Sequence, residues 1–334
     1  MIAKDEPNIH TTRSRLNRRR IGLALAGAAA IVTGLSFFGR AFWLAEILSH
    51  FRPQLALGAA LLAVLALVTR QRLNFAVAAT LMVANASPLL AYVAPLDARA
   101  APADATSIKI ITFNLHGHHA DRRALERLVA RERPDIVVLT ELPRAPHARS
   151  EVLAGAFPEL AHVMIDDGGS PHDVVIHTRW RPLAASTDRS ISRILPVMSV
   201  DLCEPQESTA PSRCLRLVAL HAARPLDGGA QARDAQLERA ASLAAAAPSH
   251  RAIVAGDLNL TPWSPVFADL LARGGLRDSA LGRGLVGTWL SRFILFGLPI
   301  DHVLVSPAFD VHDRRIGPDL GSDHLPVIVE LRLR

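Results

Sequence analysis

Residues 252–259, AIVAGDLN, run from an apolar segment directly into two polar side chains. The first four residues are small or β-branched and apolar, which is typical of a buried strand. Asp257 and Asn259 are two positions apart, so they project from the same side of an extended backbone. An Asx turn at residues 256–259 is the structural alternative, and it is compatible with a functional role. This segment therefore predicts a carboxylate and an amide at the end of a strand.

Several other predicted strands begin or end at polar residues in the same way. A rigid strand can hold such a side chain in a cleft that is shared with its neighbours. One polar residue at a strand end is usually a cap or a turn former, whereas a set of carboxylates, amides and imidazoles indicates one site. The set consists of Asn114, Glu141, His221, Asp257, Asn259, Asp301, Asp323 and His324.

The segments around these residues alternate between two patterns from residue 108 onward. Short β-branched segments alternate with amphipathic or alanine-rich ones, which predicts an α/β fold with substantial sheet content. The predicted strands are Ile108–Phe113, Ile136–Thr140, Val174–His177, Pro196–Leu202, Leu215–His221, Ala252–Ala255, Ile300–Ser306 and Leu325–Leu333. The predicted helices are Asp121–Glu132, Gln231–Ala247 and Pro265–Arg273.

Six short motifs at the strand ends carry a family resemblance. They are Ile111–Asn114, Val138–Glu141, Val218–His221, Gly256–Asn259, Ile300–Val303 and Gly321–Pro326. In this order they resemble the endonuclease/exonuclease/phosphatase (DNase I-like) superfamily over residues 106–334. The resemblance implies a four-layer α/β sandwich, in which two packed mixed β-sheets are flanked by helices. The continuation at residues 261–265, TPWSP, is similar to a bacterial membrane-anchored branch of the superfamily.

Phosphoester hydrolysis, which the resemblance implies, needs an activated water and charge stabilisation on the phosphoryl oxygens. Glu141 is the best candidate metal ligand, because a hard oxygen ligand suits Mg²⁺ or Mn²⁺. A helix cap or a surface position is the alternative for this residue. The neutral amide of Asn114 would orient metal-bound groups or contact the phosphate. The resemblance places Asp323 near the metal.

The remaining members of the set are candidate catalytic residues. In the resemblance, Asp257 accepts a proton from the attacking water or orients it, and Asn259 donates to a phosphoryl oxygen. Asp301 and His324 form a candidate carboxylate–imidazole pair, which fixes the tautomer and raises the basicity of the ring. His221 would contact the scissile phosphate or assist the leaving group.

One position departs from the pattern of the superfamily. Several members carry an acid two residues after the asparagine, where this chain has His116. This histidine is a possible ligand for a softer metal or for the substrate. A polar, histidine-rich loop at residues 116–119 is the alternative.

The N-terminal third has the composition of a membrane region. Three segments carry no charged residue, namely Ile21–Gly39, Pro53–Thr69 and Leu73–Leu96. Each is close to the ~20 residues that cross a ~30 Å hydrocarbon core, so about three transmembrane helices are expected. A cleaved signal peptide is the alternative for the first segment. The expected organisation is a basic tail at 1–20, a membrane region at 21–96, a linker at 97–107 and a catalytic domain at 108–334.

The basic residues of this region predict its orientation. Six precede the first apolar segment, and Arg70 and Arg72 flank the turn between the other two. Since basic loops stay in the cytoplasm, the N-terminus is expected inside and the catalytic domain outside, in a periplasm if the host has two membranes.

The compartment gives a role to Cys203 and Cys214, the two cysteines of the chain. They lie at the two ends of the connection between two predicted strands, so they are candidates for a disulfide in an oxidising compartment. Two unrelated thiols are the alternative.

The charge distribution bears on the substrate. Residues 1–72 carry ten basic and three acidic side chains, so residues 73–334 carry only −1 of the total net charge of +6. A near-neutral domain lacks the basic surface that tight binding to a nucleic-acid backbone usually needs. We therefore expect a lipid head group or a small soluble phosphoester as substrate, with a nuclease as the second choice. A catalytically inactive membrane protein that serves binding or assembly is the alternative of another class.

Overall fold

The computed structural model divides the chain into two compact units, residues 1–90 and 91–334. It describes residues 9–95, 107–117, 119–143, 153, 156–160, 162–165, 173–205, 213–226, 228–293 and 296–334. Most of the predicted linker at 97–107 therefore lies outside the described residues, and so do most of residues 143–169, which connect two of the predicted strands. We describe each unit by itself.

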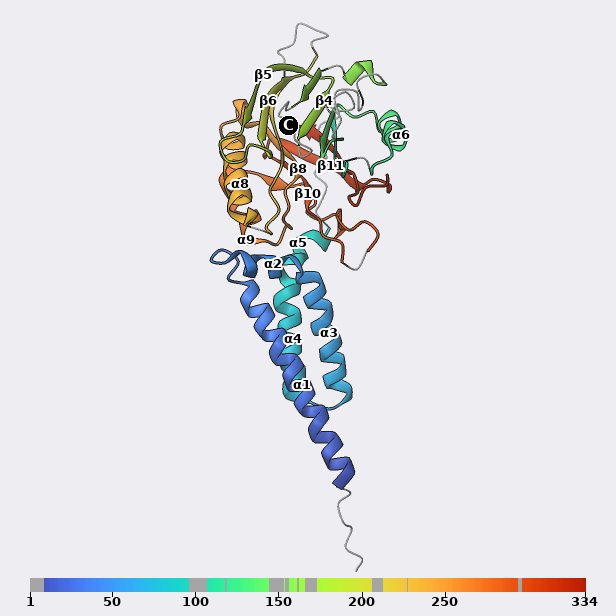
Figure 1. The fold of residues 1–334 in the computed structure, drawn as a ribbon, viewed down its shortest axis with the longest axis vertical. Coiled ribbons are helices and arrows are strands. Elements are labelled where there is room, and N and C mark those ends of the chain that lie inside the picture. Colours follow the sequence, from blue (N-terminus) through green and yellow to red (C-terminus); the bar gives the residue numbers. More distant parts are fainter. Residues whose placement is uncertain are drawn as a thin grey trace, which may run out of the picture. The chain divides into compact units, whose positions relative to one another are not determined.

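The first unit is helical (Figure 1). Its helices α1, α3 and α4 pack against one another. Its elements are α1 (Ile9–Ser36), α2 (Trp43–His50), α3 (Arg52–Val68), α4 (Arg72–Ala86) and η1 (Ser87–Leu89). The short helix α2 was not predicted, because Glu46 and His50 interrupt the apolar pattern; both side chains are buried and pair with each other at 3.1 Å.

The expectation of three membrane spans is not supported by these helices. The helix from Arg72 to Val93, which includes α5 (Leu90–Val93), is long and apolar enough to cross a membrane. Helices α2 and α3 pass the same test only together, and they are bent by 66° at the break between them. The apolar part of α1, Arg20–Ser36, is shorter than the test requires. The described residues thus contain one candidate span, or two if the bent pair is counted as one.

The second unit contains two six-stranded sheets. The first has the strand order β11-β12-β1-β2-β4-β3, and the second has the order β5-β6-β7-β8-β10-β9. Both are mixed, since β1–β2 and β7–β8 are parallel pairs among antiparallel neighbours. The strands are β1 (Ser107–Asn114), β2 (Ile136–Thr140), β3 (His162–Ile165), β4 (Val174–Thr178), β5 (Arg181–Asp188), β6 (Val197–Cys203), β7 (Cys214–His221), β8 (Ala252–Asp257), β9 (Arg277–Asp278), β10 (Asp301–Val305), β11 (Phe309–Ile316) and β12 (Val327–Leu333).

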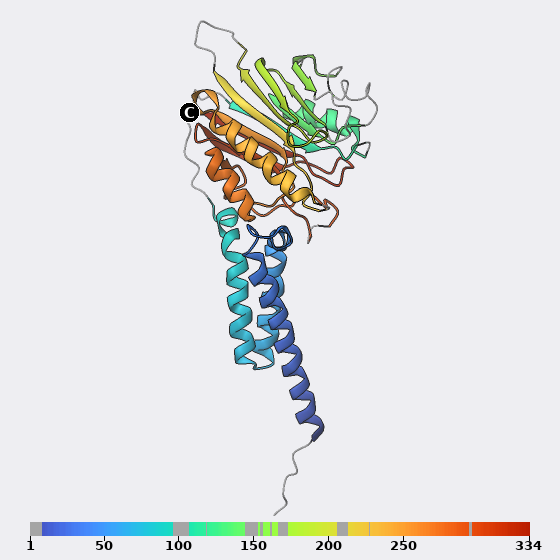
Figure 2. The same cartoon turned by 60° about the vertical axis from the view of Figure 1, so that its left-hand side comes forward.

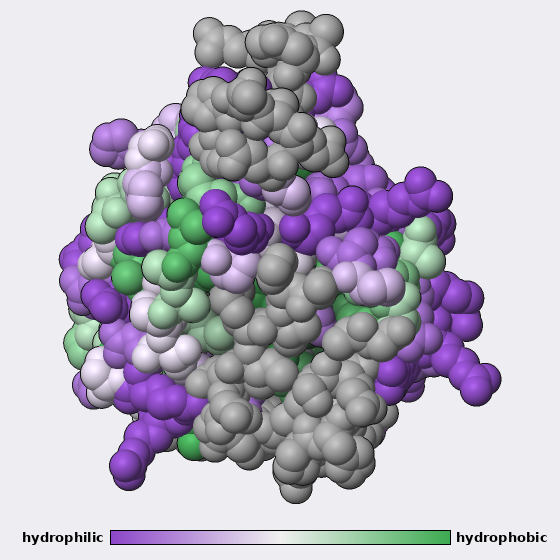
Figure 3. Space-filling model, turned by 90° about the horizontal axis from the view of Figure 1, so that it is seen from above, coloured by the Kyte–Doolittle hydropathy of each residue, from purple (hydrophilic) through white to green (hydrophobic). Residues whose placement is uncertain are grey.

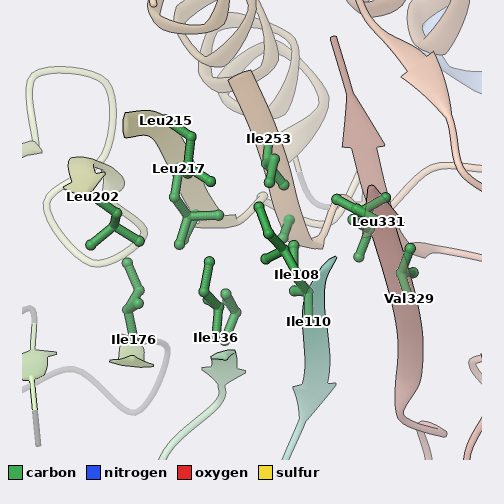
Figure 4. Close-up of a cluster of buried hydrophobic side chains, with 14 of the residues drawn as sticks. Ile108, Ile110, Ile136, Ile176, Leu202, Leu215, Leu217, Ile253, Val329 and Leu331 are labelled. Carbon is green, nitrogen blue, oxygen red and sulfur yellow. The ribbon is translucent and has the colours of Figure 1, made fainter. Parts of the chain in front are cut away.

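The two sheets pack face to face around a hydrophobic core (Figure 4). Ile108 and Ile136 of the first sheet meet Leu217 and Ile253 of the second there, and all four are fully buried. The outer face of the first sheet is covered by α6 (Arg122–Glu132), and that of the second by α8 (Gly229–Ala245) and α9 (Pro265–Gly274) (Figure 1 and Figure 2). The predicted α/β sandwich of two mixed sheets flanked by helices is confirmed.

Hydrophilic side chains predominate on the face that is seen from above, with smaller hydrophobic areas between them (Figure 3). This distribution is expected of a folded unit whose apolar strand residues are enclosed between layers.

Ala91 and Tyr92 belong to the second unit although they lie within a helix. The carbonyl groups of Ala91 and Tyr92 accept hydrogen bonds from the main-chain N–H groups of Gly282 and Gly284, at 3.0 and 2.8 Å. The Tyr92 ring is 6% exposed and meets Trp263 edge-on, with 6.5 Å between the ring centroids. The unit therefore begins before residue 108, where the catalytic domain was predicted to start.

Candidate active site

The polar residues of the predicted set meet at one edge of the two sheets. In the parallel pair β1–β2, Asn114 lies opposite Thr140, and Thr140 is the residue before Glu141. In the parallel pair β7–β8, His221 lies opposite Asp257. Asp301 faces Asp257 across an antiparallel pair. The strand register thus places chemically active groups from both sheets side by side.

The backbone is unusual at this edge. Glu141 and Asn259 have φ values of 52° and 49°, in the left-handed region that non-glycine residues rarely adopt. Gly256 has φ 141°, and a Cβ atom there would lie 1.9 Å from the carbonyl oxygen of Leu220. Such strain persists where the surrounding structure holds it, and it is concentrated at functional sites.

Asn114 lies at the centre of the cluster. Its Nδ2 donates to Glu141 Oε1 at 3.2 Å and to Asp257 Oδ2 at 3.0 Å. Its Oδ1 accepts the main-chain N–H of His116 at 2.9 Å, and its carbonyl oxygen accepts from the Ser322 hydroxyl at 2.8 Å. The amide therefore links carboxylates from the two sheets and is itself held at both ends.

Asp301 and His324 form a buried pair. Nδ1 of His324 lies 2.8 Å from Oδ2 of Asp301, and Nε2 of the same ring lies 3.8 Å from Oδ2 of Asp257. The Thr288 hydroxyl oxygen accepts the main-chain N–H groups of Ile300 and Asp301, each at 3.1 Å. Asp301 therefore orients the ring so that the other nitrogen faces the cluster.

His221 also faces the carboxylates. Its Nε2 lies 3.6 Å from Glu141 Oε1 and 3.6 Å from Asp257 Oδ2. Burial lowers the pKa of His221 to about 4, with Glu141 opposing this effect and His324 adding to it. The ring is therefore neutral at neutral pH.

The pKa of His324 moves in the opposite direction. Burial lowers it, but Asp301, Asp257 and Asp323 outweigh that effect and raise it to about 9. His324 is therefore protonated at neutral pH, and the site holds one charged and one neutral imidazole.

Two carboxyl groups of the cluster, those of Glu141 and Asp257, also differ in their pKa values. Burial raises the pKa of Glu141, but His221, the Asn114 amide and Arg224 together hold it below its usual value. Burial and the neighbouring Asp301 raise the pKa of Asp257, and His324 opposes this rise. Glu141 is therefore a fixed anion at neutral pH, whereas Asp257 can exchange a proton there.

Asn259, Asp323 and His116 lie at the border of the cluster. Asn259 Nδ2 donates to the carbonyl oxygen of Ala222 at 2.8 Å, and its main-chain N–H donates to Asp257 Oδ1 at 2.9 Å. Asp323 lies 2.9 Å from His116 Nδ1 through Oδ1 and accepts from Trp289 Nε1 through Oδ2 at 3.1 Å. Asp323 and His116 are 39% and 42% exposed, so this pair lies at the entrance of the site.

Several residues of the site were not predicted. Arg224 follows β7, and its Nη2 lies 3.2 Å from Glu141 Oε1. Thr288 and Trp289 come from a loop and hold Asp301 and Asp323. The signal for Arg224 was its position three residues after His221, whereas the loop residues lie in a segment with no strand pattern.

Cys203 and Cys214 are the predicted disulfide pair. They lie opposite each other at the ends of β6 and β7, and they are joined by a disulfide with 4.0 Å between the Cα atoms. His302, which follows Asp301, is a packing residue. It is buried against Phe267, and its Nε2 lies 2.9 Å from the carbonyl oxygen of Leu260.

The cluster offers ligand atoms of the kind that divalent cations bind. Atoms of Asp257, Asp301 and His324 lie within 4.8 Å of one another and could hold a metal. Oδ1 of Asp301 is buried and has no hydrogen-bond partner among the described residues. The Asn114 amide joins this group to a further carboxylate, because its Nδ2 donates both to Asp257 Oδ2 and to Glu141 Oε1. Hard oxygen donors of this kind fit Mg²⁺ or Mn²⁺.

Solved structures share the fold of this chain. A structure described as endonuclease/exonuclease/phosphatase from Beutenbergia cavernae is 20% identical, with a TM-score of 0.53 over 68% of this chain and 72% of its own. D. rerio TDP2 complexed with a single-strand DNA product is 20% identical, with a TM-score of 0.55 over 68% and 99%. The Bacteroides thetaiotaomicron mannosyl-6-phosphatase Bt3783 is 18% identical, with a TM-score of 0.52 over 67% and 99%.

Sequence comparison gives two further results. No curated protein matches this chain. The profile of the Endonuclease/Exonuclease/phosphatase family matches residues 111–324, which include every residue of the cluster. This chain belongs to the endonuclease/exonuclease/phosphatase family.

Proposed function

We propose that this protein is a divalent-metal-dependent phosphoester hydrolase that is tethered to a membrane, with its catalytic unit outside the cytoplasm. The observation that carries the enzymatic part is the completeness of the buried cluster. Glu141, Asp257, Asp301 and His324 come together with an ionised carboxylate, a carboxyl group of raised pKa and a protonated imidazole. A protein that kept this fold only for binding would have no need of such buried charge, which is unfavourable for stability.

Each side chain of the cluster has a separate role in the proposed hydrolysis. Asp257 would orient the attacking water and accept its proton, which its raised pKa permits at neutral pH. His324, protonated and fixed by Asp301, would stabilise negative charge on the phosphoryl group. The neutral His221 and the amide of Asn259 are further donors to the phosphoryl oxygens or the leaving group.

Glu141 and Asn114 are the residues that would hold the metal. Glu141 is the better anchor than Asp301, since it is anionic at neutral pH and Oδ2 of Asp301 is already engaged by His324. A bound Mg²⁺ or Mn²⁺ would supply Lewis-acid stabilisation of the phosphoryl oxygens. We also propose that Asp323 lies near the metal and that His116 is a possible ligand. In the structure these two side chains pair with each other, so metal binding would have to replace that contact.

The membrane tether is supported by the surface of the helical unit. Many large apolar side chains are exposed there, among them Ile21, Leu61 and Leu73, each 60% exposed or more. Contiguous exposed apolar surface indicates a membrane or a protein partner. The basic residues before the first apolar segment support a cytoplasmic N-terminus, and the disulfide is compatible with an oxidising compartment.

The substrate that we propose is a lipid head group or another small phosphoester, as either a diester or a monoester. The near-neutral charge of residues 73–334 supports this choice over long DNA. A nuclease is the alternative, because D. rerio TDP2, which shares the fold, was solved with a DNA product.

The test is hydrolysis of a chromogenic phosphodiester and of a chromogenic monoester by the full chain in detergent, with Mg²⁺, with Mn²⁺ and with a chelator. We expect activity only with metal, and its loss in Glu141→Ala. Glu238→Ala is the control, since this exposed acid lies on the surface of α8. Equal behaviour of wild type and Glu141→Ala with every metal would refute the enzymatic proposal.

A second measurement locates the metal without relying on turnover. Calorimetric titration with Mn²⁺ should show binding to the wild type and to Asp301→Asn, and much weaker binding to Glu141→Gln. If Mn²⁺ instead binds more weakly to Asp301→Asn than to Glu141→Gln, the metal site consists of Asp257, Asp301 and His324. Competition with an oligonucleotide and with a phospholipid head group then separates the nuclease from the proposed substrate class.

A further inference from the structure

A cavity of about 310 Å³ lies between α1, α3 and α4 in the helical unit. Its walls are apolar and include Leu25 of α1 and Leu62, Leu65 and Ala66 of α3. Leu25 and Leu65 are nevertheless about half exposed, so the cavity opens sideways on the surface of the unit. Its volume is at the lower end of the ~300–1,000 Å³ that is usual for small-molecule sites.

One end of the cavity is polar. Asn74 Nδ2 donates to Gln71 Oε1 at 2.6 Å, and Gln71 Nε2 donates to the Thr69 hydroxyl at 2.9 Å. These three side chains line the cavity together with Gly22, where a Cβ atom would lie only 2.7 Å from Asn74 Nδ2. The cavity therefore has an apolar wall and a hydrogen-bonding end, the two parts of an amphipathic ligand.

Three arginines are neighbours in sequence of the residues that line the cavity. Arg20 precedes the first lining residue of α1, and Arg70 and Arg72 flank Gln71 in the turn between α3 and α4. All three are exposed, and none has a carboxylate partner in the part of the chain that the structure describes. Glu46 is the single acid in the sequence between residues 9 and 96, and it pairs with His50 in α2. Uncompensated positive charge beside an apolar cavity is complementary to an anionic, amphipathic molecule.

We propose that this cavity binds one acyl chain of an anionic phospholipid, whose phosphate lies beside Arg20, Arg70 and Arg72. The chain would lie against Leu25, Leu65 and Ala66, and the ester region would meet Gln71 and Asn74. Basic residues at the edge of a membrane attract anionic lipids, and the lateral opening gives a lipid a route of entry. The site rests on the proposed membrane location of the helices and is independent of the phosphoester chemistry.

The experiment is native mass spectrometry of the full chain in a nonionic detergent. Phosphatidylglycerol and phosphatidylcholine with identical acyl chains are titrated separately. We expect one phosphatidylglycerol to bind about tenfold more tightly than phosphatidylcholine. The triple variant Arg20→Gln/Arg70→Gln/Arg72→Gln should lose this preference, whereas Arg40→Gln, outside the turn and beyond the end of α1, should keep it.

A second pair of variants tests the cavity itself. Ala66→Phe, which fills the cavity, should weaken the binding of both lipids, and Leu61→Phe, at an exposed position of the same helix, should not. Melting curves of all variants show whether each remains folded, and Ala26→Phe fills the cavity from α1 if Ala66→Phe does not fold. Equal binding of the two lipids by the wild type would overturn the proposal. So would an unchanged lipid preference in the triple variant, or displacement of the lipid by glycerol phosphate alone.

Discussion

Oδ2 of Asp301 lies 2.8 Å from Nδ1 of His324, and both side chains are buried. The carboxylate fixes the ring and favours its protonated form, so Nε2 carries a proton towards the cluster.

Asp301→Asn should lower kcat by about 10²–10⁴-fold, because the amide keeps the shape of the side chain but no longer stabilises the charged ring. KM should change little, since Asp301 lies behind His324. The measurement is steady-state hydrolysis of a chromogenic phosphoester at saturating metal, with Asp313→Asn, on the exposed side of β11, as the control. A kcat within threefold of the wild-type value would show that Asp301 does not contribute to the reaction.

The stability of the metal-free protein should fall as the pH rises from 6.5 towards 9. His324 has a folded-state pKa of about 9 against an ordinary value of 6.5, so the pair is fully stabilising below pH 6.5 and loses this contribution as pH rises through 9. Melting temperatures with a chelator present check this slope. His324→Gln should be flatter over the same interval, and an equal slope in both proteins would mean that another group is responsible.

Arg224→Gln should have opposite effects on metal and on substrate. The guanidinium contacts Glu141 at 3.2 Å, so its removal should lower the Kd for Mn²⁺. It also removes a cation at the mouth of the site, and KM for the phosphoester should rise by about three- to tenfold, a modest factor because the side chain is 63% exposed. Arg239→Gln, which breaks a surface pair with Asp188, is the control. A change of the Kd for Mn²⁺ and of the KM for the phosphoester in the same direction would contradict this account.

Gly256→Ala should destabilise the protein by at least ~3 kcal/mol, because the positive φ is combined with a clash against the carbonyl oxygen of Leu220. Gly284→Ala is the matched control, since Gly284 also has a positive φ but a Cβ atom there meets nothing within 4 Å. Strain alone should make that change cost about 1–2 kcal/mol. Denaturant unfolding measures both, and equal losses would assign the whole effect to φ.

The Cys203–Cys214 disulfide should protect both thiols from labelling until the protein is reduced. The double variant Cys203→Ser/Cys214→Ser should lose about 2–4 kcal/mol, because the unfolded chain gains freedom. For a unit of this size, ~1 kcal/mol corresponds to roughly 2–4 °C in Tm. Labelling of both thiols without reductant would show that the two cysteines are reduced in solution.

The fold was predictable where periodicity was strong. β1, β2, β7, β8, β10 and β12 follow apolar patterns. The predicted helix Asp121–Glu132 is α6, which begins at Arg122 with Asp121 as its N-cap. The edge strand β5 was missed because its side chains are largely exposed and its sequence, RPLAASTD, shows no apolar face. The strand β3 was missed as well. So were β9, which is only two residues long, and β11, in which four of the eight residues are charged.

The site was predictable for a different reason. Asn114, Glu141, His221 and Asp257 follow strands, so the topology brings them together. Arg224 was missed although it lies only three residues after His221. Thr288 and Trp289 act through a loop whose path depends on tertiary contacts, and nothing in their local sequence marks them. The membrane region was overestimated because absence of charge was treated as sufficient, whereas helix length and the bend between α2 and α3 also matter.

The burial of Tyr92 has a practical consequence for any fragment that contains only the second unit. A fragment that starts at residue 106 would remove a ring that Trp263 packs against, and two carbonyl acceptors of the loop at 282–284. Trp263 lies only four residues after Asn259, so we expect the loss to disturb the loop that holds Asn259. A fragment that is designed for activity measurements must therefore keep Ala91 and Tyr92. It will then include the last turn of an apolar helix, which is exposed to water in the fragment.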